Sequence, residues 1–218
     1  MNCLVTAGPT YEPLDKVRRL TNRSTGRLGT ELANHLTAAG HEVTLLLGEI
    51  ATWNGPCCAC RIERFTTVAD LHHRLREWVR TPPDAVFHAA AVSDFAFGRL
   101  FTRTASGALR VLGRAGKQPT RAGALLAELV PTPKVIVELR QWFPAAFLVG
   151  WKYEVDGTRE TVIRRCQSQV RQCGTDLCVA NGPAYGTGYG IVGAQGEICH
   201  APGAAALYDE LEGRLRLR

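Results

Sequence analysis

The 218-residue sequence has no apolar run close to the ~20 residues that a helix needs to cross a bilayer. It also shows no secretory signal, because Met1-Asn2-Cys3 leads directly into an apolar segment typical of a strand. Disulfides are rare in the cytoplasm, where thiols are kept reduced. We therefore expect a cytoplasmic protein with reduced cysteines and no membrane partner.

Clustered positive charge is also missing, although the net charge is +6 and the sequence pI is about 9.0. The chain has only four lysines, at positions 16, 117, 134 and 152, and its arginines are spread along the sequence. Aromatic residues make up 7% of the chain. Nucleic-acid-binding surfaces need clustered basic residues, so we expect no nucleic-acid partner.

Paired metal-binding cysteines are absent too. The one dense group among the eight cysteines is Cys57-Cys58-Ala59-Cys60, and no second C-x-x-C pair accompanies it. A structural zinc site needs a fourth ligand, which this group does not supply. We expect no metal site built from the protein alone.

Two common phosphate-binding motifs are incomplete. Gly26-Arg27-Leu28-Gly29 gives half of G-x-G-x-x-G and stands too far from the first predicted strand. Gly116-Lys117 is followed by Gln118, so no P-loop is formed. No acidic residue ends the second predicted strand, where Gly48 and Glu49 come nearest. A nicotinamide oxidoreductase therefore stays an alternative without its usual fingerprint.

The stretch from Val5 to Gly29 instead carries two clusters of small residues in one long loop. Ala7-Gly8-Pro9-Thr10 follows the first predicted strand, and Ser24-Thr25-Gly26 precedes a helix. Glycine lets a ligand approach the main chain, and a helix N-terminus attracts anions. The loop is typical of a cradle for a phosphate-bearing ligand, with plain turn chemistry as the alternative.

Strands and helices alternate through most of the chain. Apolar runs predict strands at 2–6, 42–48, 60–65, 84–88, 146–150 and 176–181, and a hairpin at 189–200. The 3.6-residue period predicts helices at 27–39, 68–80, 134–142, 158–173 and 204–217. This order is typical of an α/β fold with a Rossmann-like, mostly parallel sheet and helices on both faces.

Ligands of such sheets bind at the carboxyl ends of the strands. We therefore expect Gly8 and residues 89–94 (A-A-A-V-S-D) to meet at this edge. Asp94 would offer a carboxylate to ligand hydroxyls or to a metal, or would cap the next helix. Trp151 and Asn181 end two later strands at the same edge, and the basic helix 158–173 points toward it.

Residues 96–131 break the alternation, with short strands predicted at 109–112 and 125–130. We interpret this segment as a β-flap laid over the ligand edge, inserted in a single domain covering 1–218. Lys117 is conspicuous there, because the chain otherwise favours arginine. A lysine can follow a phosphate oxygen as a compact point charge, although a solvated loop lysine is the alternative.

Several motifs together indicate a family. The stretch V-T-A-G-P-T-Y-E-P-L-D-K-V-R-R-L-T-N-R-S-T-G-R-L-G closely resembles the opening of the phosphopantothenoylcysteine synthetases (phosphopantothenate–cysteine ligases). A-A-V-S-D-F, G-K-Q-P-T, T-P-K-V-I, G-W-K-Y-E-V-D and T-D-L-C-V-A-N follow in that family's order. The resemblance spans nearly the whole chain and is to the free-standing form, without a flavin-dependent decarboxylase domain.

The resemblance implies a ligase of coenzyme A biosynthesis. CTP or ATP, with Mg²⁺ and without flavin, activates the carboxylate of 4′-phosphopantothenate as an acyl-nucleotidylate and releases pyrophosphate. The amino group of cysteine then attacks the acyl carbon, giving 4′-phosphopantothenoylcysteine and a nucleoside monophosphate. A separate decarboxylase of the same pathway is an implied partner.

The resemblance also implies roles for individual residues. Asn22 binds the reacting carboxylate and acyl intermediate, and Lys117 stabilises phosphate charge in the first step. The implied nucleotide-binding residues are Gly8, Ser24, Gly26, Gly29, Ala89, Ala90, Asp94, Pro133, Trp151 and Asn181. The implied substrate-binding residues are Arg18, Asn22, Ala90, Ala91 and Asp94. Arg18 reaches the substrate of a neighbouring subunit, which implies a homodimer.

The chain departs from the family pattern at several positions. Pro9 replaces a glycine, and Trp151 stands where phenylalanine is usual. Helix 158–173 carries Arg165 and Arg171 near places where the family has lysines. These departures leave an alternative open, a non-catalytic or repurposed member that binds a nucleotide or phosphopantothenate. The retained Asn22, Asp94 and Lys117 favour the ligase.

Overall fold

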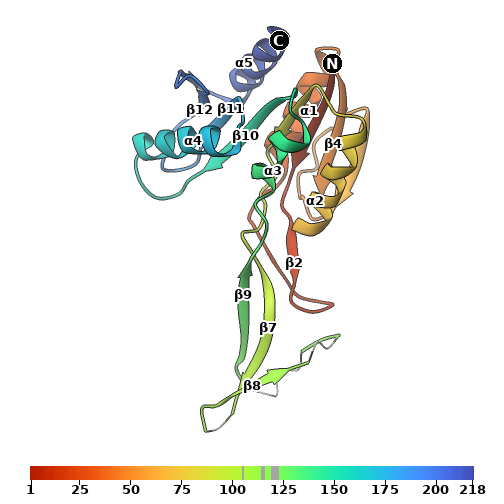
Figure 1. The fold of residues 1–218 in the computed structure, drawn as a ribbon, viewed down its shortest axis with the longest axis vertical. Coiled ribbons are helices and arrows are strands. Elements are labelled where there is room, and N and C mark those ends of the chain that lie inside the picture. Colours follow the sequence, from red (N-terminus) through yellow and green to blue (C-terminus); the bar gives the residue numbers. More distant parts are fainter. Residues whose placement is uncertain (105, 114–115, 119–122) are drawn as a thin grey trace.

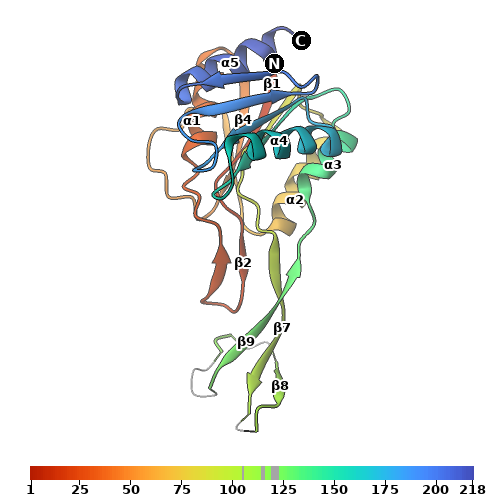
Figure 2. The ribbon, with the colours of Figure 1, turned by 90° about the vertical axis from the view of Figure 1, so that its left-hand side faces the viewer.

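The computed structural model describes residues 1–104, 106–113, 116–118 and 123–218. A body of helices packed on both faces of a large sheet lies at one end of the molecule (Figure 1). Two β-ribbons of unequal length project from this body in the same direction (Figure 2). Within the described residues, no helix is both long and apolar enough to cross a bilayer.

The body sheet has the strand order β13-β12-β11-β10-β6-β1-β4-β5. Its strands are β1 (Asn2–Ala7), β4 (Glu42–Gly48), β5 (Arg61–Phe65), β6 (Ala85–His88), β10 (Phe147–Tyr153), β11 (Leu177–Asn181), β12 (Tyr189–Gly193) and β13 (Ile198–Ala201). The run from β11 to β5 is parallel, and β12 and β13 add an antiparallel edge. The chain order of the parallel strands reverses between β1 and β6, the point where ligands of doubly wound sheets bind.

Helices cover both faces of this sheet. They are α1 (Arg27–Ala38), α2 (Val68–Glu77) with the 3-10 turn η1 (Trp78–Arg80), α3 (Val135–Trp142), α4 (Arg159–Cys173) and α5 (Ala204–Arg216). Along β1, Val5 packs with α1 and α5, whereas Leu4 packs with α2 and α3 on the opposite face. Successive strand residues face opposite sides, so an unbroken apolar strand needs helices on both. The predicted Rossmann-like α/β fold is confirmed.

Local sequence explains where two of the helices begin. The Thr67 hydroxyl accepts the N–H of Asp70 at the start of α2, at 3.1 Å. The Thr158 side chain does the same for the N–H of Thr161 at the start of α4, at 3.4 Å. A threonine before a helix satisfies one of the N–H groups that have no partner within it. The helix expected at 134–142 begins one residue later, at Val135, with Lys134 as its N-cap.

The shorter ribbon, which we call the hairpin, pairs β2 (Tyr11–Pro13) with β3 (Arg19–Thr21). It forms within the long loop between β1 and α1, where the sequence predicted no strand. The longer ribbon, which we call the arm, joins β7 (Phe95–Arg103) to β8 (Leu109–Leu112) on one side and to β9 (Leu125–Pro131) on the other. The predicted strands at 109–112 and 125–130 are confirmed, and β7 was missed.

The arm does not lie over the ligand edge as expected. It begins there, at Phe95, and runs away from the body as an extended ribbon (Figure 1). β7 and β9 pair with each other from Phe95–Pro131 to Thr102–Leu125, so their backbone groups bond within the ribbon. Paired extended strands gain about 3.3 Å per residue, which carries the arm beyond the body.

Candidate functional site

The loop after β1 and the loop after β6 meet at the switch point of the sheet. The N–H of Ala91 donates to the carbonyl of Gly8 at 2.9 Å, and the N–H of Thr10 donates to the carbonyl of Ala91 at 3.2 Å. Pro9 and Ala91 form a short parallel bridge between these bonds. The predicted meeting of Gly8 with the alanine segment 89–91 is present in the structure.

Asn22 joins the same loop from the base of the hairpin. Its Nδ2 donates to the carbonyls of Ala91, at 3.2 Å, and Val92, at 3.1 Å. The side chain is exposed. A carboxylate bound by this N–H₂ group would therefore have to replace at least one of two main-chain acceptors.

A cavity of 210 Å³ lies at the base of the arm, beside this loop. Its lining residues are His88, Ala90, Val92, Ser93, Asp94, Thr132, Pro133, Lys134, Val135, Ile136, Trp151, Lys152 and Tyr153. We call it the arm-base cavity. The structure thus gathers Ala90, Asp94, Pro133 and Trp151 from the predicted nucleotide-binding set.

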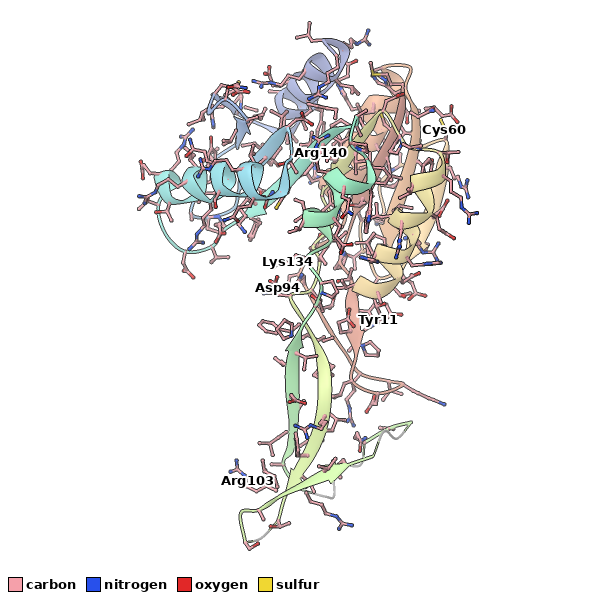
Figure 3. All side chains as sticks on the ribbon, viewed as in Figure 1. Tyr11, Cys60, Asp94, Arg103, Lys134 and Arg140 are labelled. Atoms are coloured by element: carbon pink, nitrogen blue, oxygen red, sulfur yellow. The ribbon has the colours of Figure 1, made fainter. Side chains whose placement is uncertain are left out.

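Asp94 and Lys134 form an ion pair at the mouth of this cavity, with 2.9 Å between Nζ and Oδ1 (Figure 3). Both side chains are mostly exposed, at 66% and 70%. Asp94 does not cap a helix, because β7 follows it directly. The helix-cap interpretation is therefore wrong, and the role of this exposed carboxylate toward a ligand or a metal ion stays a prediction.

His88 is a buried member of the cavity lining that the sequence interpretation missed. Its Nδ1 lies 2.9 Å from the Thr6 hydroxyl, which also accepts the N–H of Ala90 at 3.1 Å. Burial lowers the pKa of His88 to about 4. The ring is therefore neutral near pH 7 and orders the loop after β6 without adding charge to the cavity. Its position as the last residue of β6 was the available signal.

The glycines of the predicted cradle have protein atoms on the side where a Cβ would lie, and their role toward a nucleotide stays a prediction. A Cβ at Gly8 would lie 2.9 Å from Cβ of Ala51, and one at Gly29 would lie 2.6 Å from Cβ of Ala7. Gly26 has φ +82° and would place a Cβ 3.1 Å from Ala51. These glycines let the start of α1 pack closely on β1 and on the loop after β4. Ser24 is half-buried, and its N–H donates to the carbonyl of Asn22.

Asn181 lies at a second cavity, of 400 Å³, at the end of β11. The lining includes Gly182, Gly188, Tyr189 and Gly203. Oδ1 of Asn181 is buried and has no hydrogen-bond partner among the described residues. Asn181 is therefore not among the residues that line the arm-base cavity, where Trp151 lies.

Trp151 packs against the large apolar cluster around β1 and β4. Its Nε1 is buried, with no partner in the described part of the chain. The indole is thus partly buried in the core and also lines the arm-base cavity, and its packing on a nucleotide base stays a prediction.

Arg18 and Lys117 lie together, away from the arm-base cavity. The Arg18 guanidinium donates to the carbonyl of Gln118 at 3.1 Å, and the N–H of Gln118 donates to Asp15 at 3.0 Å. The N–H groups of Gln118, Val17 and Arg18 lower the pKa of the Asp15 carboxyl. This network fixes Lys117 beside the tip of the hairpin. The remaining residues of the G-K-Q-P-T motif, at 119–120, lie outside the described residues.

The arginines of α4 do not reach the arm-base cavity. Arg165 binds Glu154, and Arg159 donates to the Tyr185 hydroxyl at 2.8 Å and contacts His200 Nδ1 at 3.1 Å. Neither Arg165 nor Arg171 is among the lining residues. Arg165 and Arg159 thus pair with groups outside this cavity, and the expectation that the basic helix points toward the ligand edge stays a prediction.

No group of three or more histidine, cysteine or acidic side chains is placed to hold a metal ion within the described ranges. The loop that contains Cys57, Cys58 and Cys60 is held against α1 by hydrogen bonds. Asn34 donates to the carbonyl of Pro56 at 2.7 Å and accepts the N–H of Cys58 at 2.6 Å. This loop therefore has a packing role in the structure.

Comparison with known families identifies residues 1–203 as a match to the DNA/pantothenate metabolism flavoprotein C-terminal domain. The chain is 33% identical over 179 residues to the coenzyme A biosynthesis bifunctional protein CoaBC of Thermococcus kodakarensis, covering 82% of this chain and 40% of that protein. It is 30% identical over 190 residues to a cysteine/cysteine sulfinic acid decarboxylase of an unknown prokaryotic organism, covering 85% and 47%. The chain thus spans less than half the length of these curated relatives.

Solved structures share the fold. The DNA/pantothenate metabolism flavoprotein of Streptococcus pneumoniae superposes with a TM-score of 0.85 at 24% identity, covering 100% of this chain and 99% of that one. A Cab2 mutant (H337A) in complex with phosphopantothenate-cysteine superposes with a TM-score of 0.71 at 20% identity, covering 99% and 88%. At these identities the similarity establishes the architecture, including the projecting arm as part of the aligned chain.

Proposed function

Because the chain belongs to the DNA/pantothenate metabolism flavoprotein C-terminal domain family, we propose that residues 1–218 form one ligase domain of coenzyme A biosynthesis. The domain would join 4′-phosphopantothenate to cysteine at the expense of CTP or ATP. The observation that carries this proposal is the position of Asn22 on the Ala91–Val92 loop, at the switch point between β1 and β6. An amide and a set of main-chain groups converge there beside a charged cavity.

The reaction requires that a carboxylate become an electrophile. Its oxygen attacks the α-phosphorus of the nucleotide, a P–O bond breaks, and pyrophosphate leaves. The cysteine nitrogen then attacks the acyl carbon, loses a proton and expels the nucleoside monophosphate. No oxidation or reduction occurs, so a flavin is not needed. Asn22 would orient the carboxylate and donate to the oxygen that gains negative charge.

The residues at the arm-base cavity fit Mg²⁺ bound together with a nucleotide. Magnesium often uses one or two carboxylates together with phosphate oxygens and water. Asp94 supplies one largely exposed carboxylate, and a protein-only cage is not found among the described residues. The ion would supply positive charge to the phosphates, and Asp94 would hold it beside Lys134.

We also propose a homodimer in which the arm is covered by a second copy. Large apolar side chains stand exposed along it, at Phe95, Leu109, Val111 and Leu129. A three-stranded ribbon standing alone cannot bury both of its faces. Arg18 and Lys117 are held together at the hairpin tip, so both would serve the same site. Their distance from the arm-base cavity within one subunit supports action in the neighbouring subunit.

Location and pathway context follow from the same proposal. A cytoplasmic protein is supported by eight cysteines that are all unpaired. The proposed product carries the free carboxylate of its cysteine, so a decarboxylase is the class of enzyme that would consume it. Among the matched relatives are a bifunctional coenzyme A biosynthesis protein and a cysteine/cysteine sulfinic acid decarboxylase, which supports a decarboxylase as functional partner.

The proposal is tested by measuring pyrophosphate release by purified protein with 4′-phosphopantothenate and Mg²⁺. CTP and ATP are compared, each with and without cysteine. We expect release that depends on phosphopantothenate, sustained turnover only with cysteine, and a clear preference for one nucleotide. Binding of phosphopantothenate or nucleotide without any pyrophosphate release would instead support the repurposed binder.

Subunit sharing is tested by mixing two inactive variants, Asn22→Asp and Arg18→Ala, under conditions that exchange subunits. If Arg18 acts in the neighbouring subunit, mixed dimers contain one intact site and activity returns. Mixing that leaves activity at the level of the separate variants would place Arg18 and Asn22 in the site of the same subunit. A monomer in solution would overturn the dimer itself.

A further inference from the structure

Lysine is distributed very unevenly in this protein. Of 26 basic residues, only four are lysines, and two of these, Lys134 and Lys152, line the arm-base cavity. No arginine is found among its lining residues. Lysine differs from arginine in presenting a compact charge on a flexible stem, which can follow a ligand oxygen rather than fix one geometry.

The two lysines approach the cavity from different elements. Lys134 is the N-cap of α3, and Lys152 is the sixth residue of β10. Gly150, two residues before Lys152 in β10, leaves room for Gln169 and Ile136: a Cβ there would lie 2.5 Å from Nε2 of Gln169. Lys152 and Lys134 both act electrostatically on Cys173, the last residue of α4. No residue of α4 is among the described lining residues of the cavity, whose cationic side chains are these two lysines.

Both ammonium groups can leave their present ion-pair partners at little cost in stability. The ion pair of Lys134 with Asp94 is largely exposed, and exposed pairs contribute little stability. Nζ of Lys152 lies 3.8 Å from Oε1 of Glu154. The other oxygen of Glu154 is bound by Arg165, so Lys152 can turn away without leaving that carboxylate unpaired.

The balance of charge in the cavity is positive. Its lining holds two lysines and one carboxylate, that of Asp94. His88 adds no charge near neutral pH, because its buried ring is neutral. The first turn of α3 also begins here, at Val135 and Ile136, and no side chain caps it. N–H groups at the start of a helix have no partner within the helix and favour an anion.

We propose that Lys134 and Lys152 bind the polyphosphate of the nucleotide, which makes the arm-base cavity a phosphate site served by α3 and β10. The inference rests on the proposed function and assigns to these lysines the charge that α4 does not bring to the cavity. Lys134 exchanges Asp94 for a phosphate oxygen, and Asp94 is then released to the metal ion. Arg165 stays with Glu154 and keeps Lys152 available.

The test compares binding of CTP, ATP, the corresponding nucleosides and inorganic tripolyphosphate by calorimetry. The variants are Lys134→Gln, Lys152→Gln and the double substitution. Arg171→Gln is the matched control, because it removes the same charge from exposed α4 without touching the cavity. Each lysine variant is expected to weaken triphosphate and tripolyphosphate binding about 10- to 100-fold, the range for hydrogen bonds to charged groups. Nucleoside affinity and the KM for phosphopantothenate should stay unchanged.

Several outcomes would overturn the inference. One is triphosphate affinity within twofold of wild type in the double variant; another is an equal loss in Arg171→Gln. A raised KM for phosphopantothenate with unchanged nucleotide affinity would assign the lysines to the phosphate of that substrate. Recovery in Lys152→Arg would support a role for charge. A wild-type protein that binds tripolyphosphate through these lysines but releases no pyrophosphate would overturn the ligase and leave the phosphate site standing.

Discussion

The body and the arm of this protein differ in how much of their apolar surface is buried. In the body, strands such as β1 and β6 are buried on both faces, and Phe87 is fully enclosed and edge-on to Phe147 at 6.2 Å. In the arm, β9 alternates between exposed and half-buried residues, and Val111 of β8 is 58% exposed. The body is stabilised by its own core, whereas the described residues of the arm bury little apolar surface. A long extended ribbon can thus depend on the body for its attachment without adding to the body's core.

The largest effect that separates the two regions is expected from core truncation. Phe87→Ala should lower the free energy of unfolding by about 3–5 kcal/mol, because it leaves a cavity in a close-packed core. Val111→Ala in the arm should change it by no more than about 0.5 kcal/mol. Urea denaturation at low protein concentration measures both. A large cost at Val111 that grows with protein concentration would show that a second copy already covers the arm.

At the base of the hairpin, a substitution should lower turnover strongly while changing stability little. Asn22→Asp removes two N–H donors and adds a negative charge beside the reacting carboxylate, so turnover should fall about 10²- to 10³-fold. The melting temperature should fall by only a few degrees, because the two hydrogen bonds of Asn22 to Ala91 and Val92 that are lost are exposed to solvent. Gln195→Glu, which adds the same charge on the distant turn between β12 and β13, is the control. Wild-type turnover in Asn22→Asp would remove this residue from the site.

A third comparison concerns a buried group of the body. Burial lowers the pKa of His88 to about 4 from an ordinary 6.5. Between these two pH values the histidine is protonated in the unfolded chain and neutral in the folded chain. Stability is therefore full above pH 6.5 and falls as the pH drops toward 4, by up to about 3 kcal/mol. His88→Asn should flatten this part of the curve of unfolding free energy against pH. Parallel curves for the two proteins would show that His88 is not the group responsible.

The smallest effect on stability is expected at the tip of the hairpin. Lys117 is exposed, so Lys117→Gln should leave the melting temperature unchanged while slowing pyrophosphate release about tenfold or more. Lys16→Gln, a neighbouring exposed lysine, is the matched control. If both substitutions slow the reaction equally, the tip acts through its total charge. If Lys117→Gln lowers only the melting temperature, Lys117 is structural.

The arm also shows why a strand can escape sequence analysis. β7 reads F-A-F-G-R-L-F-T-R, with aromatic residues at 95, 97 and 101. A shift of register between Phe97 and Leu100 breaks the two-residue period midway. A bulge of this kind places residues on the opposite face without changing the composition. The segment therefore resembled a basic loop, although each half of it alternates as a strand does.

The glycines of the long loop illustrate a different limit. Sequence identified Gly8, Gly26 and Gly29 as points of close approach, which is what the structure shows at each of them. It could not identify which protein groups lie where a Cβ would be, and these include Ala7 and Ala51. A glycine in the sequence indicates only that the position cannot hold a Cβ. The identity of the occupant depends on segments far away in the sequence.

The sequence by itself determined the parallel sheet, the placing of helices on both of its faces and the meeting of Gly8 with residues 89–94 at the edge formed by the carboxyl ends of the strands. These features follow from periodicity and from the short connections of alternating strands and helices. Only the tertiary structure decided that the arm leaves the body, that Lys117 lies beside Arg18, and that Lys134 and Lys152 share one cavity with Asp94. Local pattern reports which face of an element is buried. Long-range contacts alone decide which charges become neighbours.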